Sequence, residues 1–252
     1  MTTSTRPGTS ARITWLGHAT LLLELGGVRL LTDPVLRSRL AHLRRHGPAP
    51  PVPGQLDAVL LSHLHYDHLD LPSLRLLRRD VRILAPAHAA PLIRRAGFPE
   101  VEELMPGQAA RVGGIRVEAT PAQHDERRRP LGPRAKPIGF VVRGTRAVYF
   151  AGDTHLFPEM AELSPVDVAL LPVAGWGPTL GPGHMDAEHA ARAAELLRPG
   201  IAVPIHWGTL HPRGRRRGAW FHRPPHEFAA RLAGLAPEIE VRILAPGELL
   251  EL

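Results

Sequence analysis

A six-residue stretch at positions 63–68 constrains this chain more than any other part of its sequence. It supplies His63, His65, Asp67 and His68 directly after a short apolar run that is typical of a buried strand. His63 and His65 are two residues apart, so an extended backbone directs both rings to the same side. Burying these polar groups is costly unless each has a partner, which favours a metal site over a chance group of core histidines.

Three later segments each place a further candidate ligand just past an expected strand. These candidates are His124, Asp153 and His206. Taken alone, each has an ordinary explanation, as a loop histidine, a turn former or a core histidine. Ligands tend to bind where the strands of an open sheet end, so the shared position favours one joint site. A carboxylate such as Asp153 could bridge two divalent ions there, and Gly152 would let the backbone come close to them.

The composition limits both the compartment and the kind of metal ligand. The chain has no Cys, which excludes disulfides and thiolate ligands and agrees with a cytoplasmic protein. The sequence holds no run of about 18 apolar residues, so no membrane span is expected. Residues 1–10 are polar, lack the apolar core of a signal peptide and are expected to form a disordered leader. Residues 11–252 are expected to form a single domain.

The formal net charge is +7, and almost all basic side chains are Arg. Coding bias, with Ala, Arg, Pro and Gly all abundant, explains this total better than anion binding does, and nucleic acid is not expected as a partner. Two clusters, at 127–129 and 213–217, each follow a candidate metal ligand. They could bind a phosphate or another anion through bidentate hydrogen bonds, or they could form solvated loops. A solvated loop is the better account of most of these arginines, and no sequence feature fixes the oligomeric state.

The order of expected elements indicates an α/β protein. Strands are expected over 12–16, 20–25, 28–32, 58–61, 81–85, 109–112, 115–119, 138–143, 147–151, 168–173, 201–205 and 240–244. Helices are expected over 71–79, 87–96, 186–198 and 226–235, with Asp186 as an N-cap, and 37–55 is expected to be a long loop. Strands and helices alternate in both halves, so two sheets with helices outside would form a four-layer αββα sandwich.

The set of candidate ligands resembles that of the metallo-β-lactamase superfamily from about residue 12 to residue 245. Further segments are similar to the branch that contains ascorbate-6-phosphate lactonase and N-acyl-phosphatidylethanolamine phospholipase D. These segments are 15–20, 31–34, 122–124, 152–154, 183–186 and 204–208. The resemblance implies the αββα sandwich of that fold and a centre of two divalent ions. By position, His63, His65 and His124 would hold the first metal, Asp67, His68 and His206 the second, and Asp153 would bridge both.

The resemblance implies a metal-dependent hydrolase of a small anionic ester, either a phosphodiester or a lactone. A hydroxide shared by two metal ions would be the nucleophile. Asp67 would orient it and accept a proton, and His184 would donate a hydrogen bond to the oxyanion or leaving group. Zn is the first expectation for the ions, with Mn or Fe as alternatives. The ordinary explanation for His184 is a histidine at a helix start that faces solvent.

Several alternatives stay open at this stage. The chain could be a nuclease or a lipid phosphodiesterase, or a metal-binding module without activity. Asp33 could support a ligand histidine or simply form an Asp-Pro turn, and Trp176 and Trp207 could line a pocket or fill the core. His18 could approach the site from the first hairpin or bond its own turn.

Overall fold

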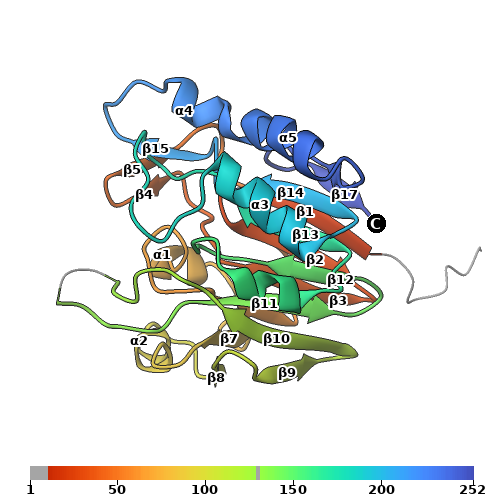
Figure 1. The fold of residues 1–252 in the computed structure, drawn as a ribbon. Helices are drawn as coiled ribbons and strands as arrows, with labels where there is room; N and C mark the ends of the chain where they lie inside the picture. Colours follow the sequence, from red (N-terminus) through yellow and green to blue (C-terminus); the bar gives the residue numbers. More distant parts are fainter. Residues whose placement is uncertain (1–10, 129–130) are drawn as a thin grey trace, which may run out of the picture.

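Two seven-stranded sheets form the centre of the fold in the computed structural model, which describes residues 11–128 and 131–252 (Figure 1). The leader expected at 1–10 and Arg129 of the first arginine cluster lie outside the described residues. The first sheet has the order β17-β1-β2-β3-β6-β7-β8. Its strands are β1 (Ala11–Gly17), β2 (Thr20–Leu25), β3 (Val28–Thr32), β6 (Ala58–Leu60), β7 (Arg82–Pro86), β8 (Val101–Leu104) and β17 (Leu249–Glu251).

The second sheet has the order β16-β14-β13-β12-β11-β10-β9. Its strands are β9 (Ala109–Val112), β10 (Ile115–Pro121), β11 (Ile138–Arg143), β12 (Ala147–Phe150), β13 (Val168–Pro172), β14 (Ile201–Ile205) and β16 (Glu240–Val241). Strands β12, β13 and β14 run parallel, so their carboxyl ends lie at one edge. Those ends carry two of the candidate ligands.

Apolar side chains fill the space between the sheets and cover their outer faces. Ile13 and Leu21 of the first sheet share one buried cluster with Phe140 and Leu170 of the second. Helices α3 (Ala187–Leu197) and α5 (Pro224–Leu235) cover the outer face of the second sheet, and α1 (Leu71–Leu74) and α2 (Ala90–Arg95) cover that of the first (Figure 1). The predicted four-layer αββα sandwich is therefore confirmed.

The helices are short, and their ends follow local sequence signals. The carboxylate of Asp186 accepts a hydrogen bond from the backbone N–H of His189, so the predicted N-cap of α3 is present. The helix expected over 71–79 ends after one turn, at Leu74. The structure also contains a 3-10 helix, η1 (Pro158–Leu163), and a short α4 (Ala219–His222). Within the described ranges, no helix has the length and apolar character that crossing a bilayer requires.

The proline-rich segment 37–55 contains a β-hairpin that its composition did not indicate. Strands β4 (Arg39–Leu40) and β5 (Leu43–Arg45) form a hairpin, and β15 (Leu210–Pro212) joins it in a third sheet. Leu40 and Leu43 are buried against Val35 and Leu210. This small apolar cluster holds the hairpin in place, so the expectation of a long loop over 37–55 was wrong for the strands at Arg39–Leu40 and Leu43–Arg45.

Candidate metal centre

All seven side chains proposed as ligands converge from separate strand ends. Residues 63–68 lie in the loop between β6 and α1, whereas His124 follows β10, Asp153 follows β12 and His206 follows β14. The structure thus brings together residues that are up to 143 positions apart in the sequence, from His63 to His206. Gly152 adopts a positive φ of 62°, and a Cβ at that position would meet the Cβ of Ser62 at 2.6 Å. Only glycine permits this approach of β12 to the histidine loop.

The first group of ligand atoms consists of three imidazole nitrogens. The Nδ1 of His65 lies 3.1 Å from the Nε2 of His63 and 2.9 Å from the Nε2 of His124. Burial lowers the pKa of His63 well below its usual value, and burial lowers that of His124 to about 4. The rings are therefore neutral at neutral pH, which leaves lone pairs for a metal ion.

The second group lies beside the first and combines imidazole with carboxylate. The Nε2 atoms of His68 and His206 are 3.1 Å apart. The Oδ2 of Asp67 lies 3.6 Å from the Nε2 of His206 and 3.8 Å from that of His68. These groups are buried at the base of a cleft, where their mutual proximity is costly without a cation.

Asp153 lies between the two groups. Its Oδ2 is 3.1 Å from the Nε2 of His68 and 3.9 Å from the Nε2 of His124, so one carboxylate faces both groups. Its Oδ1 is buried 3.2 Å from the Nε2 of His206 and makes no hydrogen bond within the described residues. Burial alone would raise the pKa of Asp153, but His206 and His68 outweigh it and hold that pKa well below the usual range. An ionised carboxylate with an orphaned oxygen is suited to bridging two cations.

Hydrogen bonds on the far side of three rings direct their Nε2 atoms into the centre. The Nδ1 of His68 donates to Asp33 at 2.7 Å, that of His206 donates to the carbonyl of Ala174 at 2.8 Å, and that of His124 donates to the carbonyl of Gly183 at 2.8 Å. Such contacts fix the ring orientation and the tautomer of a metal-binding histidine. Asp33 thus contacts a candidate ligand as well as ending β3.

The donor set fits divalent ions that prefer nitrogen and carboxylate oxygen. Five imidazoles and two carboxylates, with no thiolate, suit Zn and also Mn or Fe. Within each group the ligand atoms lie within 4.8 Å of one another. Two compact groups joined by one carboxylate could hold two ions side by side, whereas a single ion would leave one group without a partner.

A cleft of about 250 Å³ opens above these ligands. Its lining includes Asp67, Asp153, Tyr66 and the tip of the β4–β5 hairpin. Trp176 also lines the cleft, whereas Trp207 stacks on Trp15 with ring centroids 5.2 Å apart. Of the two tryptophans considered from the sequence, one therefore borders the cleft and the other fills the core.

His184 points into the cleft from the segment before α3. Its Nε2 lies 3.4 Å from the Oδ2 of Asp153, and its Nδ1 donates to the carbonyl of Gly181 at 3.0 Å. Burial alone would lower the pKa of His184, but the hydrogen bond and charge of Asp153 outweigh burial and raise it to about 9. With 21% of its side chain exposed, His184 is not a solvent-facing residue at a helix start.

His18 joins the second group, so of the two alternatives left open by the sequence it approaches the site from the first hairpin. Its Nε2 lies 3.0 Å from the Oδ2 of Asp67, and only 1% of the residue is exposed. The carbonyl of His18 accepts a hydrogen bond from the backbone N–H of His206 at 3.0 Å. Its positive φ of 58° turns the chain sharply between β1 and β2. The signal in the sequence was its place directly after a glycine in a hairpin turn.

The two arginine clusters differ in position. Arg128 is buried and lines the cleft, where its guanidinium lies 4.2 Å from the centroid of the Tyr66 ring and donates to the carbonyl of Leu69. Arg127 is exposed. Residues 215–217 of the second cluster instead line a separate cavity on the far side of the β4–β5 hairpin.

Comparison with known proteins identifies the family. A family model described as a beta-lactamase superfamily domain matches residues 28–207. A UPF0173 metal-dependent hydrolase of Methanopyrus kandleri is 34% identical over 244 residues, which cover 94% of this chain and 98% of that protein. Another from Opitutus terrae is 36% identical over 251 residues, covering 95% of this chain and 99% of that protein.

A solved structure agrees with these relatives. A metallo hydrolase from the archaeon Ignicoccus hospitalis has a TM-score of 0.74 at 28% identity, covering 97% of this chain and 99% of that chain. The family match spans all seven candidate ligands. The chain therefore belongs to the metallo-β-lactamase superfamily, in the UPF0173 family, and is a metal-dependent hydrolase.

Proposed function

We propose that this hydrolase cleaves a small anionic ester, a phosphodiester or a lactone, at a centre of two divalent metal ions. The observation that carries the proposal is the convergence of the candidate ligands below a small cleft with cationic side chains in its lining. Arg128 and His184 are those cations. A cleft of about 250 Å³ suits a small substrate better than a polymer.

The ligand groups support a dinuclear centre. His63, His65 and His124 would hold one ion, Asp67, His68 and His206 would hold the other, and Asp153 would contact both. Zn is the first expectation, with Mn or Fe as alternatives. When bound, two such ions lower the pKa of a shared water and take up negative charge from the substrate.

Asp67 is suited to orient a water molecule and accept its proton. Burial alone would raise the pKa of Asp67, but His68 and the hydrogen bond from His18 outweigh it and hold that pKa well below its usual range. The carboxylate is therefore ionised and lines the cleft. An ionised carboxylate can accept the hydrogen bond that orients a water molecule, and it would take up the proton where bound metal ions make that water more acidic.

His184 is suited to donate a hydrogen bond, whereas Asp67 accepts one. Its Nδ1–H bonds the carbonyl of Gly181, which fixes the ring, and its Nε2 faces Asp153 across the cleft. The contact with the charge of Asp153 favours a proton on both nitrogens of this ring. It can thus donate a hydrogen bond to negative charge that develops on a carbonyl or phosphoryl oxygen, or to the leaving group.

The segments 15–20 and 183–186 support a place in the branch with ascorbate-6-phosphate lactonase and the lipid-cleaving phospholipase D. Both segments supply side chains that reach the centre, His18 from the first and His184 from the second. This placement favours an ester with a negative charge close to the scissile bond. A nuclease or a lipid phosphodiesterase is the second candidate, because both also hydrolyse phosphodiesters.

Metal analysis tests the first part of the proposal. Protein purified without added metal should contain two divalent ions per chain by elemental analysis. A content that saturates at one ion per chain after incubation with Zn, Mn or Fe would contradict the dinuclear centre.

A substrate panel tests the second part. The metal-loaded enzyme should turn over bis(p-nitrophenyl) phosphate or members of a lactone panel. Cleavage of single-stranded RNA with neither small substrate accepted would favour the nuclease. No turnover on any of the three, by protein that holds its metals, would contradict the proposed substrate class.

A further inference from the structure

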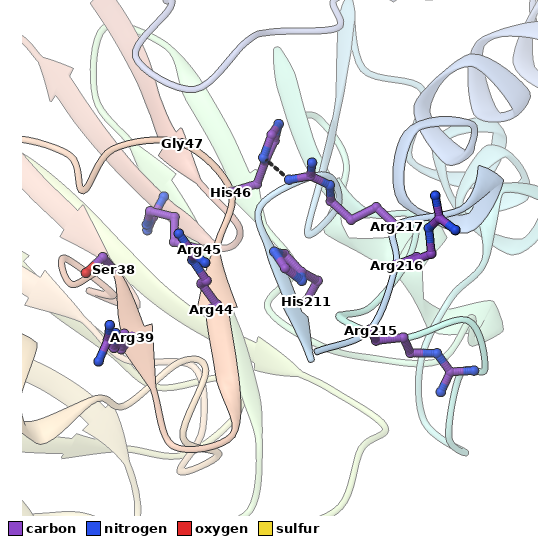
Figure 2. Close-up of a pocket in the computed structure, with 10 residues that line it drawn as sticks. All are labelled: Ser38, Arg39, Arg44, Arg45, His46, Gly47, His211, Arg215, Arg216 and Arg217. Carbon is purple, nitrogen blue, oxygen red and sulfur yellow. Dashed lines mark hydrogen bonds between the residues drawn. The ribbon is translucent and has the colours of Figure 1, made fainter. Parts of the chain in front are cut away.

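A second cavity lies on the far side of the β4–β5 hairpin from the metal-binding cleft. It measures about 790 Å³ and is bordered by β5 on one side and by residues 215–217 on the other (Figure 2). That volume is within the usual range for pockets that bind small molecules. The hairpin separates the two spaces, since Leu40 and Leu43 line the cleft whereas Arg39 and Arg44 line the cavity.

Positive charge dominates this cavity. The arginines that line it are Arg39, Arg44, Arg45, Arg215, Arg216 and Arg217. His46 and His211 complete the titratable groups, and the described lining contains no Asp or Glu. Guanidinium groups stay charged at every physiological pH. The cavity therefore concentrates several positive charges without an internal anion.

Carboxylates elsewhere in the described chain do not neutralise these arginines either. Among residues 11–128 and 131–252, none of the six forms an ion pair with an acidic side chain within 4.0 Å. Other surface arginines do form such pairs, as Arg192 does with Glu188 and Arg242 with Glu240. Arginines elsewhere in the described chain, such as Arg75 and Arg111, also lack such a pair, so the distinguishing feature of the cavity is that six arginines line one space without an Asp or Glu.

Arg45, the buried arginine of the cavity, adds to its excess of positive charge. Arg45 is 3% exposed, and its guanidinium donates to the carbonyls of Leu16 and Val35. Its Nε is buried and has no hydrogen-bond partner in the described part of the chain. Burial lowers the pKa of Arg45 to about 10, so the group stays charged at neutral pH. A buried charge without a counterion is unfavourable, and a nearby anion would reduce that cost.

One hydrogen bond in the cavity also reflects the lack of carboxylates. The guanidinium of Arg217 donates to the Nδ1 of His46, where a carboxylate would be the usual acceptor (Figure 2). Burial, and after it the charge of Arg217, keeps the pKa of His46 below its usual value. His46 therefore accepts this bond as a neutral ring. Arg44 on β5 and Arg217 lie on opposite walls of the cavity (Figure 2).

We propose that this cavity is a second ligand site, separate from the metal centre, that binds a small molecule carrying phosphate groups. Phosphate oxygens match the fork of N–H donors that a guanidinium presents, and several arginines can each bind one face of the group. A single carboxylate would neutralise less of the charge. Long-range attraction from the whole cluster would also raise the local concentration of such an anion.

Isothermal titration calorimetry of the metal-loaded enzyme with fructose 1,6-bisphosphate tests the proposal, with fructose as the uncharged control. We expect saturable binding below about 1 mM that weakens as salt is added, and no binding of fructose. Arg44→Gln and Arg217→Gln should each weaken binding about tenfold, because each removes a charge-assisted hydrogen bond. Arg95→Gln, which removes one exposed charge from α2, should leave binding unchanged.

Two further variants locate the bound probe. His65→Ala alters the metal centre and should leave binding of the bisphosphate intact. Loss of binding in His65→Ala, with wild-type affinity in both cavity variants, would place the probe at the metals and overturn the proposal. Absence of saturable binding to the wild-type enzyme would also overturn it. A single-stranded oligonucleotide that binds more tightly than the bisphosphate, and loses affinity in the cavity variants, would assign the cavity to nucleic acid instead.

Discussion

The Oδ2 of Asp33 accepts a hydrogen bond from the Nδ1 of His68 at 2.7 Å, and both side chains are fully buried. Asp33 also accepts hydrogen bonds from the backbone N–H and the hydroxyl of Ser62, at 2.8 and 2.5 Å. The carboxylate at the end of β3 thus fixes both the start of the histidine loop and the ring at its end. With its Nδ1 engaged, His68 presents Nε2 to Asp153 and His206.

We expect Asp33→Asn to weaken metal binding about 10- to 100-fold, the usual effect of losing a carboxylate behind a ligand histidine. The amide has a single acceptor oxygen and no charge, so it cannot hold Ser62 and His68 as Asp33 does. Competition with a chromophoric chelator measures the affinity. Asp57→Asn, at a carboxylate that bonds the backbone of Arg29 far from the centre, should behave as wild type. Equal affinities in the two variants would contradict the role of Asp33.

Much of the centre could be predicted because each ligand follows a short apolar run. Strand ends gather at one edge of a sheet, so the order of runs and ligands suggested both the sandwich and the convergence of His124, Asp153 and His206. The same reasoning missed β4 and β5, because their apolar content is two leucines between arginines and their partner strand β15 lies far along the chain. Pairing at such separation leaves no local pattern.

The approach of His18 to the site was one of two alternatives from the sequence, but its contact with Asp67 could not be chosen there. It depends on a positive φ at His18, which few residues other than glycine adopt, and on a turn that packs against the backbone of His206. Neither feature has a periodic signature. The cavity of arginines was hidden for a similar reason, since Arg44 and Arg217 become neighbours only through the third sheet.

His65→Ala and Asp153→Ala should each abolish turnover. His65 has contacts to both other nitrogens of the first group, and Asp153 faces both groups, so neither loss can be compensated by a neighbour. Steady-state rates on the best substrate of the panel measure the effect. His226→Ala removes an exposed histidine from α5. It is the control for losing an imidazole outside the centre, and it should keep wild-type activity. Full activity in either centre variant would contradict the assigned ligands.

Removing the metals should lower the melting temperature. Five imidazoles and two carboxylates then share a buried space without a cation, and a ligand that binds only the folded state stabilises it by about 2.7 kcal/mol at 100 times its Kd. Calorimetric melting before and after dialysis against a chelator measures the change, and added Zn should reverse it. An identical melting temperature with and without metals would argue against a metal centre at these residues.

His18→Asn should lower activity by about 10- to 100-fold while the protein stays folded. Asparagine tolerates the positive φ at this position, but its side chain is too short to reach Asp67. The carboxylate would then lose the donor that holds its Oδ2. The expected signature is a lower kcat together with a shifted pH profile of kcat, because Asp67 is the proposed proton acceptor. If His18→Asn lowered only the thermal stability and left kcat and its pH profile unchanged, His18 would contribute to packing and not to the position of Asp67.

Asp186→Ala should destabilise the protein by about 1 kcal/mol at neutral pH, the usual cost of removing an N-cap. Burial alone would raise the pKa of Asp186, but hydrogen bonds from the backbone and ring of His189 outweigh it and lower that pKa. A carboxyl whose pKa is lower in the folded state contributes stability above its unfolded pKa of about 3.9 and loses it as pH falls further. Urea unfolding should therefore show the difference between wild type and Asp186→Ala shrinking below about pH 3.9.

Asp186→Asn separates the cap from its charge. The amide oxygen still accepts the backbone hydrogen bond of His189, so this variant should stay close to wild type at neutral pH. Because the amide does not titrate, its stability relative to Asp186→Ala should stay constant as pH falls. If Asp186→Asn were as unstable as Asp186→Ala at neutral pH, the contact of the carboxylate with the ring of His189, rather than the cap, would account for the effect of Asp186 on α3.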